Sequence, residues 1–323
     1  VPISWGGTGT VDDRFKFELV TTTDSESTII PHLDGYTYDY MVDFGDGTPL
    51  NHITSYDDTG CTHVYDVPGS YIVTISGICE SFYILGNAPM STQLYRILSW
   101  GHTEMKTPNF SGAENLLTIP SNNVSDSFGS VLSFNNCFEY TALSSVPEGL
   151  FHNCTDITSF DSTFGHCGRM TKIPVNIFYE CPNVTSFNYL LENSILTEIP
   201  EDLFINCPNV TQFTGTFRNI TQLTSIPEGL FRNNTNVTDF SQVFAFCTEI
   251  KSIPTDLFRY CTGVTNMSYV FGGCGVTSIP ADLFRYNTEV LNFSLVFSMC
   301  YGLTSIPADL FRYNTEVLNF SLV

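Results

Sequence analysis

One column of side chains in this sequence has the chemistry of a contact surface. Arginine and tyrosine recur five and six residues after a regularly spaced proline, at Arg232, Arg259, Tyr260, Arg285, Tyr286, Arg312 and Tyr313. Guanidinium and phenol groups are enriched at the energetic centres of protein interfaces, and a periodic row of them suits an extended partner. The alternative is structural: acids three residues before the last three arginines, such as Asp256, would form ordinary surface ion pairs.

Cysteines recur in two further columns, and both columns predict a structural role. The first, seven residues after proline, holds Cys154, Cys181, Cys207 and Cys261, with Asn234, Asn287 and Asn314 in other units. The second holds Cys167, Cys247, Cys274 and Cys300, with Ser194 and Ile220 as substitutes. A metal ligand or a nucleophile does not tolerate such exchanges, whereas a small buried group that bonds the backbone of a turn does. Disulfides between neighbouring units are the alternative.

The sequence predicts no catalytic site, no cofactor and no metal. The six histidines include no pair at metal-ligand spacing, C-x-x-C is absent, and His166 beside Cys167 is the one Cys–His proximity. G-x-S-x-G, P-loop and G-x-G-x-x-G motifs are also absent. Asp43 and Asp46 lack the ligand spacing of an EF-hand, so we expect a turn in which aspartate bonds the backbone. Paired carboxylates in a cleft stay open, since 33 acids make chance pairs inevitable.

Composition narrows the classes of partner. The chain has 323 residues, with 33 acidic and 12 basic side chains and a net charge of −21. This charge disfavours nucleic acids and anionic membranes, both of which attract basic proteins. No apolar window is long enough for a membrane-spanning helix. Because the chain opens with Val1 rather than methionine, we expect a processed or trimmed start, with any secretion signal or lipid anchor upstream of Val1.

The elements that position these columns are repeats. Prolines 120, 147, 174, 200, 227, 254, 280 and 307 lie 26 or 27 residues apart, within the pattern L-T-S-I-P-x-D-L-F-x-x-C/N-x-x-V-T-x-F-S-x-x-F-x-x-C. Each unit carries several large apolar side chains at fixed positions, such as Phe258 and Phe271, that it cannot enclose alone. Stacked units would bury them in continuous columns. We expect short β stretches at L-T-S-I and V-T-x-F, paired in parallel, and a helical turn at P-x-D-L-F.

The repeats resemble a known family. "NVTDFSQVFAFCTEIKSIPTDLF" and "VTNMSYVFGGC" are similar to BspA-type leucine-rich repeats of bacterial surface proteins, over residues 116–323 and with the last repeat incomplete. The sequence departs from the family pattern where S-I-P and V-F-x-x-C replace I-x-I-P and A-F-x-x-C. The resemblance implies an extracellular or cell-surface protein that binds or adheres to an extracellular protein or glycan through its solenoid. A glycan-acting enzyme or its accessory, and a passive structural stalk, are the alternatives.

The region before the repeats reads as a β domain. Residues 15–23, 36–44 and 69–77 alternate between apolar and polar side chains. "DFGDGTP", "HVY" and "PGSYIVTISG" resemble the PKD family of immunoglobulin-like sandwiches, with Tyr65 and Tyr71 on its closing hairpin. The expected fold is therefore mainly β with short helical turns: a PKD-like sandwich over 1–84, a connector and cap over 85–115, and the solenoid. Trp100 and Leu98 are expected to seal the top of the solenoid. A disulfide between Cys61 and Cys79 stays open.

The chain stops within a repeat. Residues 304–323 duplicate residues 277–296, and the last unit ends before its F-x-x-C segment and without a polar cap. We expect that the natural chain continues, or that a partner or a second copy covers this uncapped C-terminal end by association.

Overall fold

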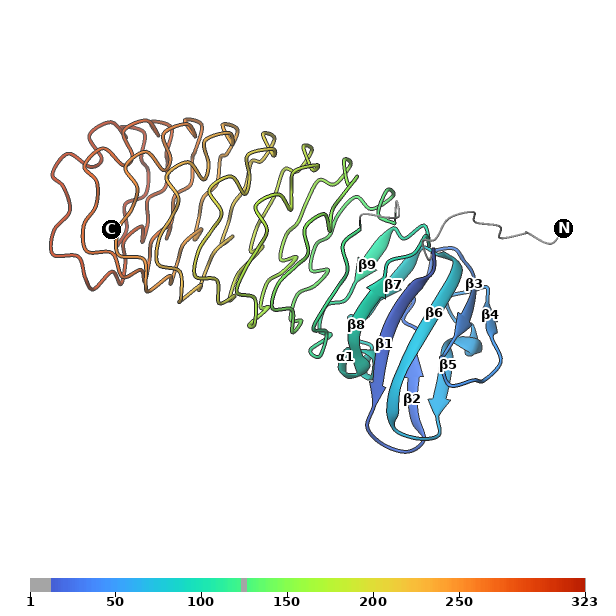
Figure 1. Ribbon diagram of the computed structural model, residues 1–323. Helices are drawn as coiled ribbons and strands as arrows, with labels where there is room; N and C mark the ends of the chain where they lie inside the picture. The colour runs from blue at the N-terminus through green and yellow to red at the C-terminus, as the bar shows by residue number, and fades with distance from the viewer. Residues whose placement is uncertain (1–12, 123–126, 323) are drawn as a thin grey trace.

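The protein is elongated: a β domain at one end leads into a long stack of chain turns (Figure 1). The computed structural model describes residues 13–122 and 127–322. The fold is mainly β, and the single α-helix of the described residues is α1 (Ala88–Gln93). None of the helices in this part of the chain has the length and apolar character needed to cross a membrane.

The β domain is built on a five-stranded antiparallel sheet in the order β4-β3-β6-β1-β8. Its strands are β1 (Phe15–Thr21), β3 (Tyr38–Asp43), β4 (Asn51–Ile53), β6 (Gly69–Cys79) and β8 (Leu94–Ser99). A second ladder pairs β2 (Glu26–Ile29) with β5 (Thr62–Tyr65), which directly follows the 3₁₀ turn η1 (Thr59–Cys61). The three alternating segments of the sequence become β1, β3 and β6, as predicted.

Alternation fixes which side of each strand is buried. In β1, Phe15, Phe17 and Leu19 are buried while the residues between them are half-exposed. In β3, Tyr40 and Val42 are buried and their neighbours exposed. Successive side chains of a strand point to opposite faces, so one face of the sheet packs on the core and the other meets solvent.

The β domain and the solenoid share one core. The parallel pair β7 (Ser81–Tyr83) and β9 (Thr107–Asn109) begins the stack, and the rings of Phe82, Phe110 and Phe138 follow one another at 5.3 and 5.5 Å. Strand β8 pairs with β1 and also bridges Thr118 of the solenoid through Arg96. The segment expected as a connector, 85–115, therefore contributes one strand to the sheet and another to the start of the stack.

Trp100 seals the junction as predicted, but Leu98 does not. The Trp100 ring is buried between Phe15 of the sheet and Phe128 of the first repeats, and its Nε1 donates to the Pro120 carbonyl (2.8 Å). Leu98 is 41% exposed. In β8 the inward position belongs to Ile97 instead, because neighbouring side chains of a strand cannot point to the same face.

In the solenoid, each repeat unit forms one rung, and neighbouring rungs pair through single parallel bridges. One bridge column runs through Ser133, Ser159, Ser186, Gln212, Asp239, Asn266, Asn292 and Asn319. The parallel pairing predicted at V-T-x-F is thus present, but it is reduced to one residue per rung. At L-T-S-I the bridge Ser145–Lys172 is found. The P-x-D-L-F segment is a series of tight turns, as in Leu257 N–H donating to the Pro254 carbonyl (3.4 Å).

The predicted aromatic columns are buried and stacked. Rings four residues after the repeat proline follow one another with near-parallel planes at 5.8 to 6.3 Å: Phe151, Phe178, Phe204, Phe231, Phe258, Phe284 and Phe311. A second column, from Phe160 to Phe240, repeats at 5.7 to 5.8 Å. Rings within the column contact the rungs before and after them and are buried, whereas Phe311 in the last rung is only partly buried, so burial is a property of the stack rather than of any single unit.

Each rung also turns two corners at residues with positive φ. The first corner passes through Ser162, Tyr189, Gly215, Gln242, Tyr269 and Leu295, and the second through His166, Asn193, Asn219, Phe246, Gly273 and Met299. The backbone N–H of the corner residue donates to a carbonyl of the next rung, as from Tyr269 to Ser294 (2.9 Å) and from Phe246 to Gly272 (2.7 Å). The stack therefore imposes the left-handed conformation, which favours glycine and asparagine, whatever the side chain.

Candidate functional site

The Arg–Tyr ladder is a continuous row of side chains along one corner of three consecutive rungs. We use this name for Arg259, Tyr260, Arg285, Tyr286, Arg312 and Tyr313. Each arginine ends the tight turn that starts at the repeat proline, and its N–H donates to the carbonyl of an aspartate three residues earlier (3.1 Å in all three rungs). The same turn in each rung therefore presents the same pair of side chains at the same place.

The ladder is held by cation–π contacts within and between rungs. The Arg259 Cζ lies 5.9 Å from the ring centre of Tyr260 and 5.1 Å from that of Tyr286 in the next rung. Arg285 repeats this arrangement at 5.7 Å from Tyr286 and 5.5 Å from Tyr313. The ring quadrupole attracts the guanidinium in each contact. The three tyrosines nevertheless stay 37% to 52% exposed, so the row is ordered but accessible.

Two of the three surface ion pairs that the spacing predicts coexist with the stack. The Arg259 Nη1 lies 3.1 Å from Asp256 Oδ2, and the Arg285 Nη1 lies 3.8 Å from Asp282 Oδ2. The hydrogen bond that Arg259 donates to Asp256 raises the pKa of Arg259. Arg232 makes a different contact, since its Nη2 reaches back one rung to Asp202 Oδ1 (2.7 Å). Arg232 therefore lies outside the stacked ladder.

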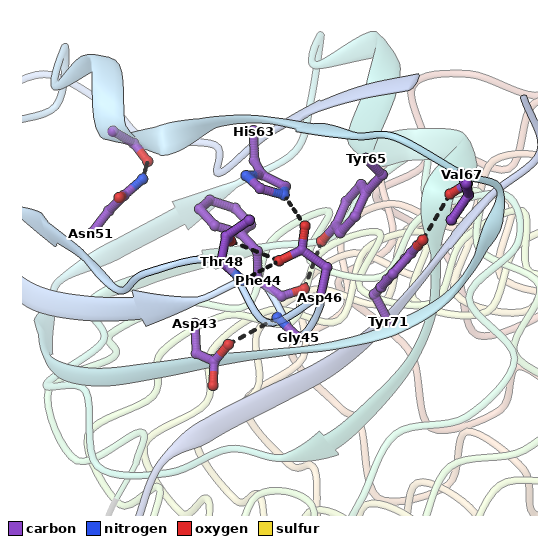
Figure 2. Close-up of polar contacts among 11 residues, drawn as sticks. Asp43, Phe44, Gly45, Asp46, Thr48, Asn51, His63, Tyr65, Val67 and Tyr71 are labelled. Atoms are coloured by element: carbon purple, nitrogen blue, oxygen red, sulfur yellow. Dashed lines mark hydrogen bonds and ion pairs between the residues drawn. The ribbon is translucent and has the colours of Figure 1, made fainter. Parts of the chain in front are cut away.

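The D-F-G-D-G segment forms the predicted turn, in which aspartates bind backbone (Figure 2). Asp43 Oδ1 accepts the N–H of Gly45 (2.9 Å), and Asp46 Oδ1 accepts the N–H and the hydroxyl of Thr48 (3.0 and 2.6 Å). Asp46 Oδ2 lies 2.7 Å from His63 Nε2. Burial raises the pKa of Asp46, but the bonds from Thr48 and His63 outweigh it and lower that pKa to about 2.

Tyrosines anchor the same region to the strands. The Tyr65 hydroxyl donates to the Phe44 carbonyl (3.0 Å) and the Tyr71 hydroxyl to the Val67 carbonyl (2.7 Å), as Figure 2 shows. The phenol rings of Tyr65 and Tyr71 stack at 4.0 Å. All these groups are committed to holding the turn, and no cluster of three or more metal-ligating side chains occurs in the described ranges.

The thiol and amide columns bond the backbone of the preceding rung, which confirms their structural role. The Asn287 Nδ2 donates to the carbonyls of Phe258 (3.0 Å) and Cys261 (2.9 Å). Cys261 Sγ donates to the carbonyls of Phe231 (3.7 Å) and Asn234 (3.4 Å). In the second column Cys247, Cys274 and Cys300 donate to one phenylalanine carbonyl each, at 3.0 to 3.1 Å. Cysteine and asparagine are interchangeable in the first column because each supplies a donor to the same pair of carbonyls.

These thiols are not prepared for nucleophilic attack. Burial raises the pKa of Cys207, Cys247 and Cys261 to about 12. A thiol attacks as its thiolate, so a raised pKa makes the group inert. His166 does not change this, because it stacks on Tyr140 (ring centres 4.3 Å apart) while Cys167 Sγ points to the Phe138 carbonyl (3.1 Å).

Sequence reasoning missed one Cys–His contact. His32 Nδ1 lies 3.5 Å from Cys61 Sγ, and His32 Nε2 lies 2.9 Å from the Tyr40 hydroxyl, beside a cavity of about 450 Å³. Burial lowers the pKa of His32 to about 4 and raises that of Cys61 to about 11. Both groups are therefore neutral near pH 7 and do not form an activated thiolate–imidazolium pair. No local pattern announces this contact, since 29 residues separate the two side chains.

Comparison with known proteins identifies the repeats. The family described as BspA type leucine rich repeat region matches in 6 copies over residues 124–291 and 219–322, which together cover more than half of the chain. Chains in two structures of the Drosophila Toll–Spatzle complex, one of them in glycosylated form, are similar at 18% and 17% identity, with TM-scores of 0.39 and 0.42. These matches cover 69% and 68% of this chain but only 32% and 34% of those chains. No curated protein matches. On its repeats, the chain belongs to the BspA type leucine rich repeat family.

Proposed function

We propose that this protein is a non-enzymatic, exported cell-surface protein whose solenoid binds an extracellular protein through the Arg–Tyr ladder. The family points to a protein-interaction or surface role. The observation that carries the finer proposal is the ladder itself: alternating guanidinium and phenol groups are ordered over three rungs and left half-exposed. Tyrosine and arginine are the side chains most enriched among interface hot spots, because they offer a large contact area and hydrogen bonds together.

The ladder favours an extended partner. Its cations repeat once per rung, so a segment lying along the solenoid axis would meet a guanidinium and a phenol at each step. The protein as a whole carries a net charge of −21, which makes a row of cations a local exception. Carboxylates or backbone carbonyls of the partner would accept hydrogen bonds from the guanidinium N–H groups that Asp256 and Asp282 do not occupy.

The β domain would present the solenoid rather than bind the partner. We propose that residues 1–84 form a PKD-like sandwich whose sheet is completed by β8 of the next segment, and that 85–115 otherwise join and cap the solenoid of 116–323. The turn at Asp43–Asp46 and the tyrosine contacts of Tyr65 and Tyr71 support the first part. The shared core at Trp100 supports the second, since it gives the junction a fixed geometry.

A triple substitution tests the ladder. We would bind the purified chain to arrays of extracellular matrix proteins and of glycans, then repeat the assay with Arg259, Arg285 and Arg312 each replaced by serine. Affinity for a protein found on the array should fall by about tenfold or more, because truncating a hot-spot residue costs over about 1 kcal/mol. The matched control replaces Arg96, Lys172 and Lys251 by serine, which removes the same charge from exposed positions elsewhere.

Four results would overturn the proposal. Equal affinity of the triple variant and the wild type would show that the ladder does not take part in binding. An equal loss of affinity in the control variant would show that the ladder arginines act only through their positive charge. Hydrolysis of a polysaccharide by the pure chain would favour the alternative of a glycan-acting enzyme or accessory, and the absence of any bound partner would favour a passive stalk.

A further inference from the structure

A second surface of the solenoid differs from the ladder because its residues do not repeat. This surface lies at the two positive-φ corners of each rung, which come after the bridge residue along the chain. The ladder lies at a different corner, before the bridge residue. We call it the corner edge, and define it by Tyr140, His166, Glu192, Arg218, Phe246 and Tyr269, which come from six consecutive rungs. In a repeat protein, a position that changes from rung to rung is not needed for stacking, so its side chains are free to serve a single ligand.

Every neighbour in the corner edge contacts the next. His166 stacks on Tyr140 and lies 3.8 Å from Glu192 Oε2, and Glu192 Oε1 is bonded by the Arg218 guanidinium. The Arg218 Cζ lies 5.5 Å from the ring centre of Phe246. The rings of Phe246 and Tyr269 lie 5.4 Å apart and are tilted by 55°. The contacts fix the aromatic pair in one orientation.

Phe246 lines two adjoining cavities that are open to solvent, and Tyr269 lines the first of them. The first measures about 390 Å³ and is lined by Arg218, Gln242, Phe246, Ser268, Tyr269 and Ser294, with Leu295 beside them. The second measures about 300 Å³, shares Phe246, and continues to Met299 and Tyr301. Glycines make the room: a Cβ at Gly273 would lie 2.6 Å from the Phe246 ring, and one at Gly272 would lie 2.8 Å from the Tyr269 ring. Small-molecule sites have this order of volume.

The backbone at this place is unsuited to the side chains that it carries. Phe246, Tyr269, Leu295 and Met299 all adopt positive φ, between 59° and 63°. The equivalent residues of earlier rungs include Gly215, Asn193 and Asn219, which adopt this conformation readily. The stack imposes this conformation at every corner, including Tyr140 and Tyr189 away from the cavities, so what distinguishes this place is that four bulky side chains gather there around the two cavities.

From this arrangement we propose that the corner edge around Phe246 and Tyr269 is a binding site for a neutral oligosaccharide, separate from the Arg–Tyr ladder. A sugar ring presents C–H groups on its face, which the negative face of an aromatic ring attracts. Its hydroxyls need both donors and acceptors, and the Gln242 amide and the hydroxyls of Ser268 and Ser294 supply both. The shared wall at Phe246 lets the site accept more than one sugar unit.

Charge selects a neutral ligand. Arg218 is the one charged side chain lining the two cavities, and its guanidinium is already bonded to the carboxylate of Glu192, a side chain that is only 11% exposed. An acidic sugar would have to displace Glu192 and approach a protein with a net charge of −21. A basic ligand would meet the Arg218 cation.

Substitutions borrowed from other rungs test the site without disturbing the stack. Phe246→Asn restores the residue type of Asn193 and Asn219, and Tyr269→Gln restores that of Gln242, at equivalent positions. We would titrate the full chain with cellohexaose, xylohexaose, mannohexaose and chitohexaose by calorimetry. At least one is expected to bind, and the double variant should weaken it by tenfold or more. Tyr189→Gln, in the same corner column and away from both cavities, is the matched control and should bind as the wild type does.

The outcomes separate this site from the ladder. Replacing the ladder arginines by serine should leave oligosaccharide binding unchanged, whereas loss of binding in that variant would place the sugar at the ladder and overturn this proposal. Binding of none of the four probes, binding of oligogalacturonate in their place, or equal binding by the double variant would overturn it as well. Loss of a protein partner with the double variant would assign the corner edge to a protein interface instead.

Discussion

In the β domain each buried polar contact occurs once, whereas in the solenoid the same contact returns in rung after rung. Tyr65, Tyr71 and Tyr38 each donate a hydroxyl to a backbone carbonyl, but the three bonds lie in different local settings and do not recur at a fixed spacing. Asn287, in contrast, repeats the bonds that Asn234 makes two rungs earlier. Cys261, in the rung between them, makes equivalent bonds through its sulfur. In the β domain a structural role thus belongs to one particular residue. In the solenoid it belongs to a position in the repeat, whichever of several residue types occupies it. This is why cysteine and asparagine exchange in the solenoid and why its non-repeating positions stand out.

The largest expected effect concerns how far damage spreads in the two regions. Phe258 contacts the rings of Phe231, Phe240, Phe271 and Phe284. Phe258→Ala should lower the free energy of unfolding by about 3–5 kcal/mol, the cost of removing a buried phenylalanine. Because rungs contact only their neighbours, amide hydrogen exchange should rise mainly in the rungs around residue 258.

The matched variant for that experiment is Phe17→Ala in the β domain, where the ring contacts Phe15 and Phe82. Its exchange should rise across the whole five-stranded sheet, since the sheet has one core. Uniform exchange along the entire solenoid in Phe258→Ala would contradict the local description and show that the stack unfolds as one unit.

Acid should weaken the β domain specifically. His32 has a pKa lowered to about 4 from its ordinary 6.5, so below pH 6.5 the unfolded chain binds a proton that the folded chain refuses. Stability therefore falls as pH drops through this window, by up to about 3 kcal/mol near pH 4. Urea unfolding at pH 7 and pH 4.5 measures the effect. Glu26 and Asp46, whose pKa values are lowered to about 2 from 4.5 and 3.8, stabilise the fold at higher pH and lose this contribution mainly below those ordinary values, so Glu26 adds to the effect of His32 at the acid end of the window.

A variant without the imidazole provides the control for the acid experiment. His32→Gln should show a flatter dependence of stability on pH between 4.5 and 7 than the wild type, whatever its absolute stability. Identical slopes in the two proteins would mean that another group is responsible for the acid sensitivity.

The smallest of these effects tests whether roles belong to columns. Asn287→Ala removes the side-chain donor from the carbonyls of Phe258 and Cys261, although Phe258 still accepts the Cys261 N–H (3.1 Å), and should lower the free energy of unfolding by about 1–3 kcal/mol. Asn287→Cys should recover most of that loss, because cysteine performs the same role in neighbouring rungs. Thermal and urea unfolding of both variants measure the difference.

The comparison needs the same pair of changes in the β domain. Asn51 donates its Nδ2 to the Gly60 carbonyl (2.9 Å), and no column offers a cysteine precedent there. Asn51→Cys should therefore be no better than Asn51→Ala. If Asn287→Cys proves as damaging as Asn287→Ala, the interchange of thiol and amide within the column is not a matter of equivalent bonding.

Patterns of short range could be predicted along the chain. The repeat length, the buried phenylalanine columns, the bonding role of the cysteines and the turn at Asp43 and Asp46 all follow from residue type at fixed spacing. The wrong prediction for Leu98 also came from residue type. An apolar residue near Trp100 was expected to be buried, but the pleat of β8 buries Ile97 instead. The residue type at one position does not determine which face of a strand that side chain lies on.

The Arg–Tyr ladder shows where sequence reasoning stops. Its residues could be listed from their spacing, yet the interleaving of Arg259 with Tyr286, and the separation of Arg232 from the row, depend on how far one rung is rotated and shifted against the next. The corner edge had only a weak signal, namely columns in which the residue changes from rung to rung. The contact between Arg218 and Phe246 then required the stack itself.

By itself, the sequence determined that this protein is a stack of 26- to 27-residue units, because the periodic apolar side chains of one unit can be buried only by the next. It also determined the chemistry of each column. The tertiary structure alone decided which columns meet across rungs, that β8 joins the sheet to the solenoid, and that His32 reaches Cys61. Those contacts join residues far apart in the chain, and their geometry depends on the packing of the whole core rather than on local preference.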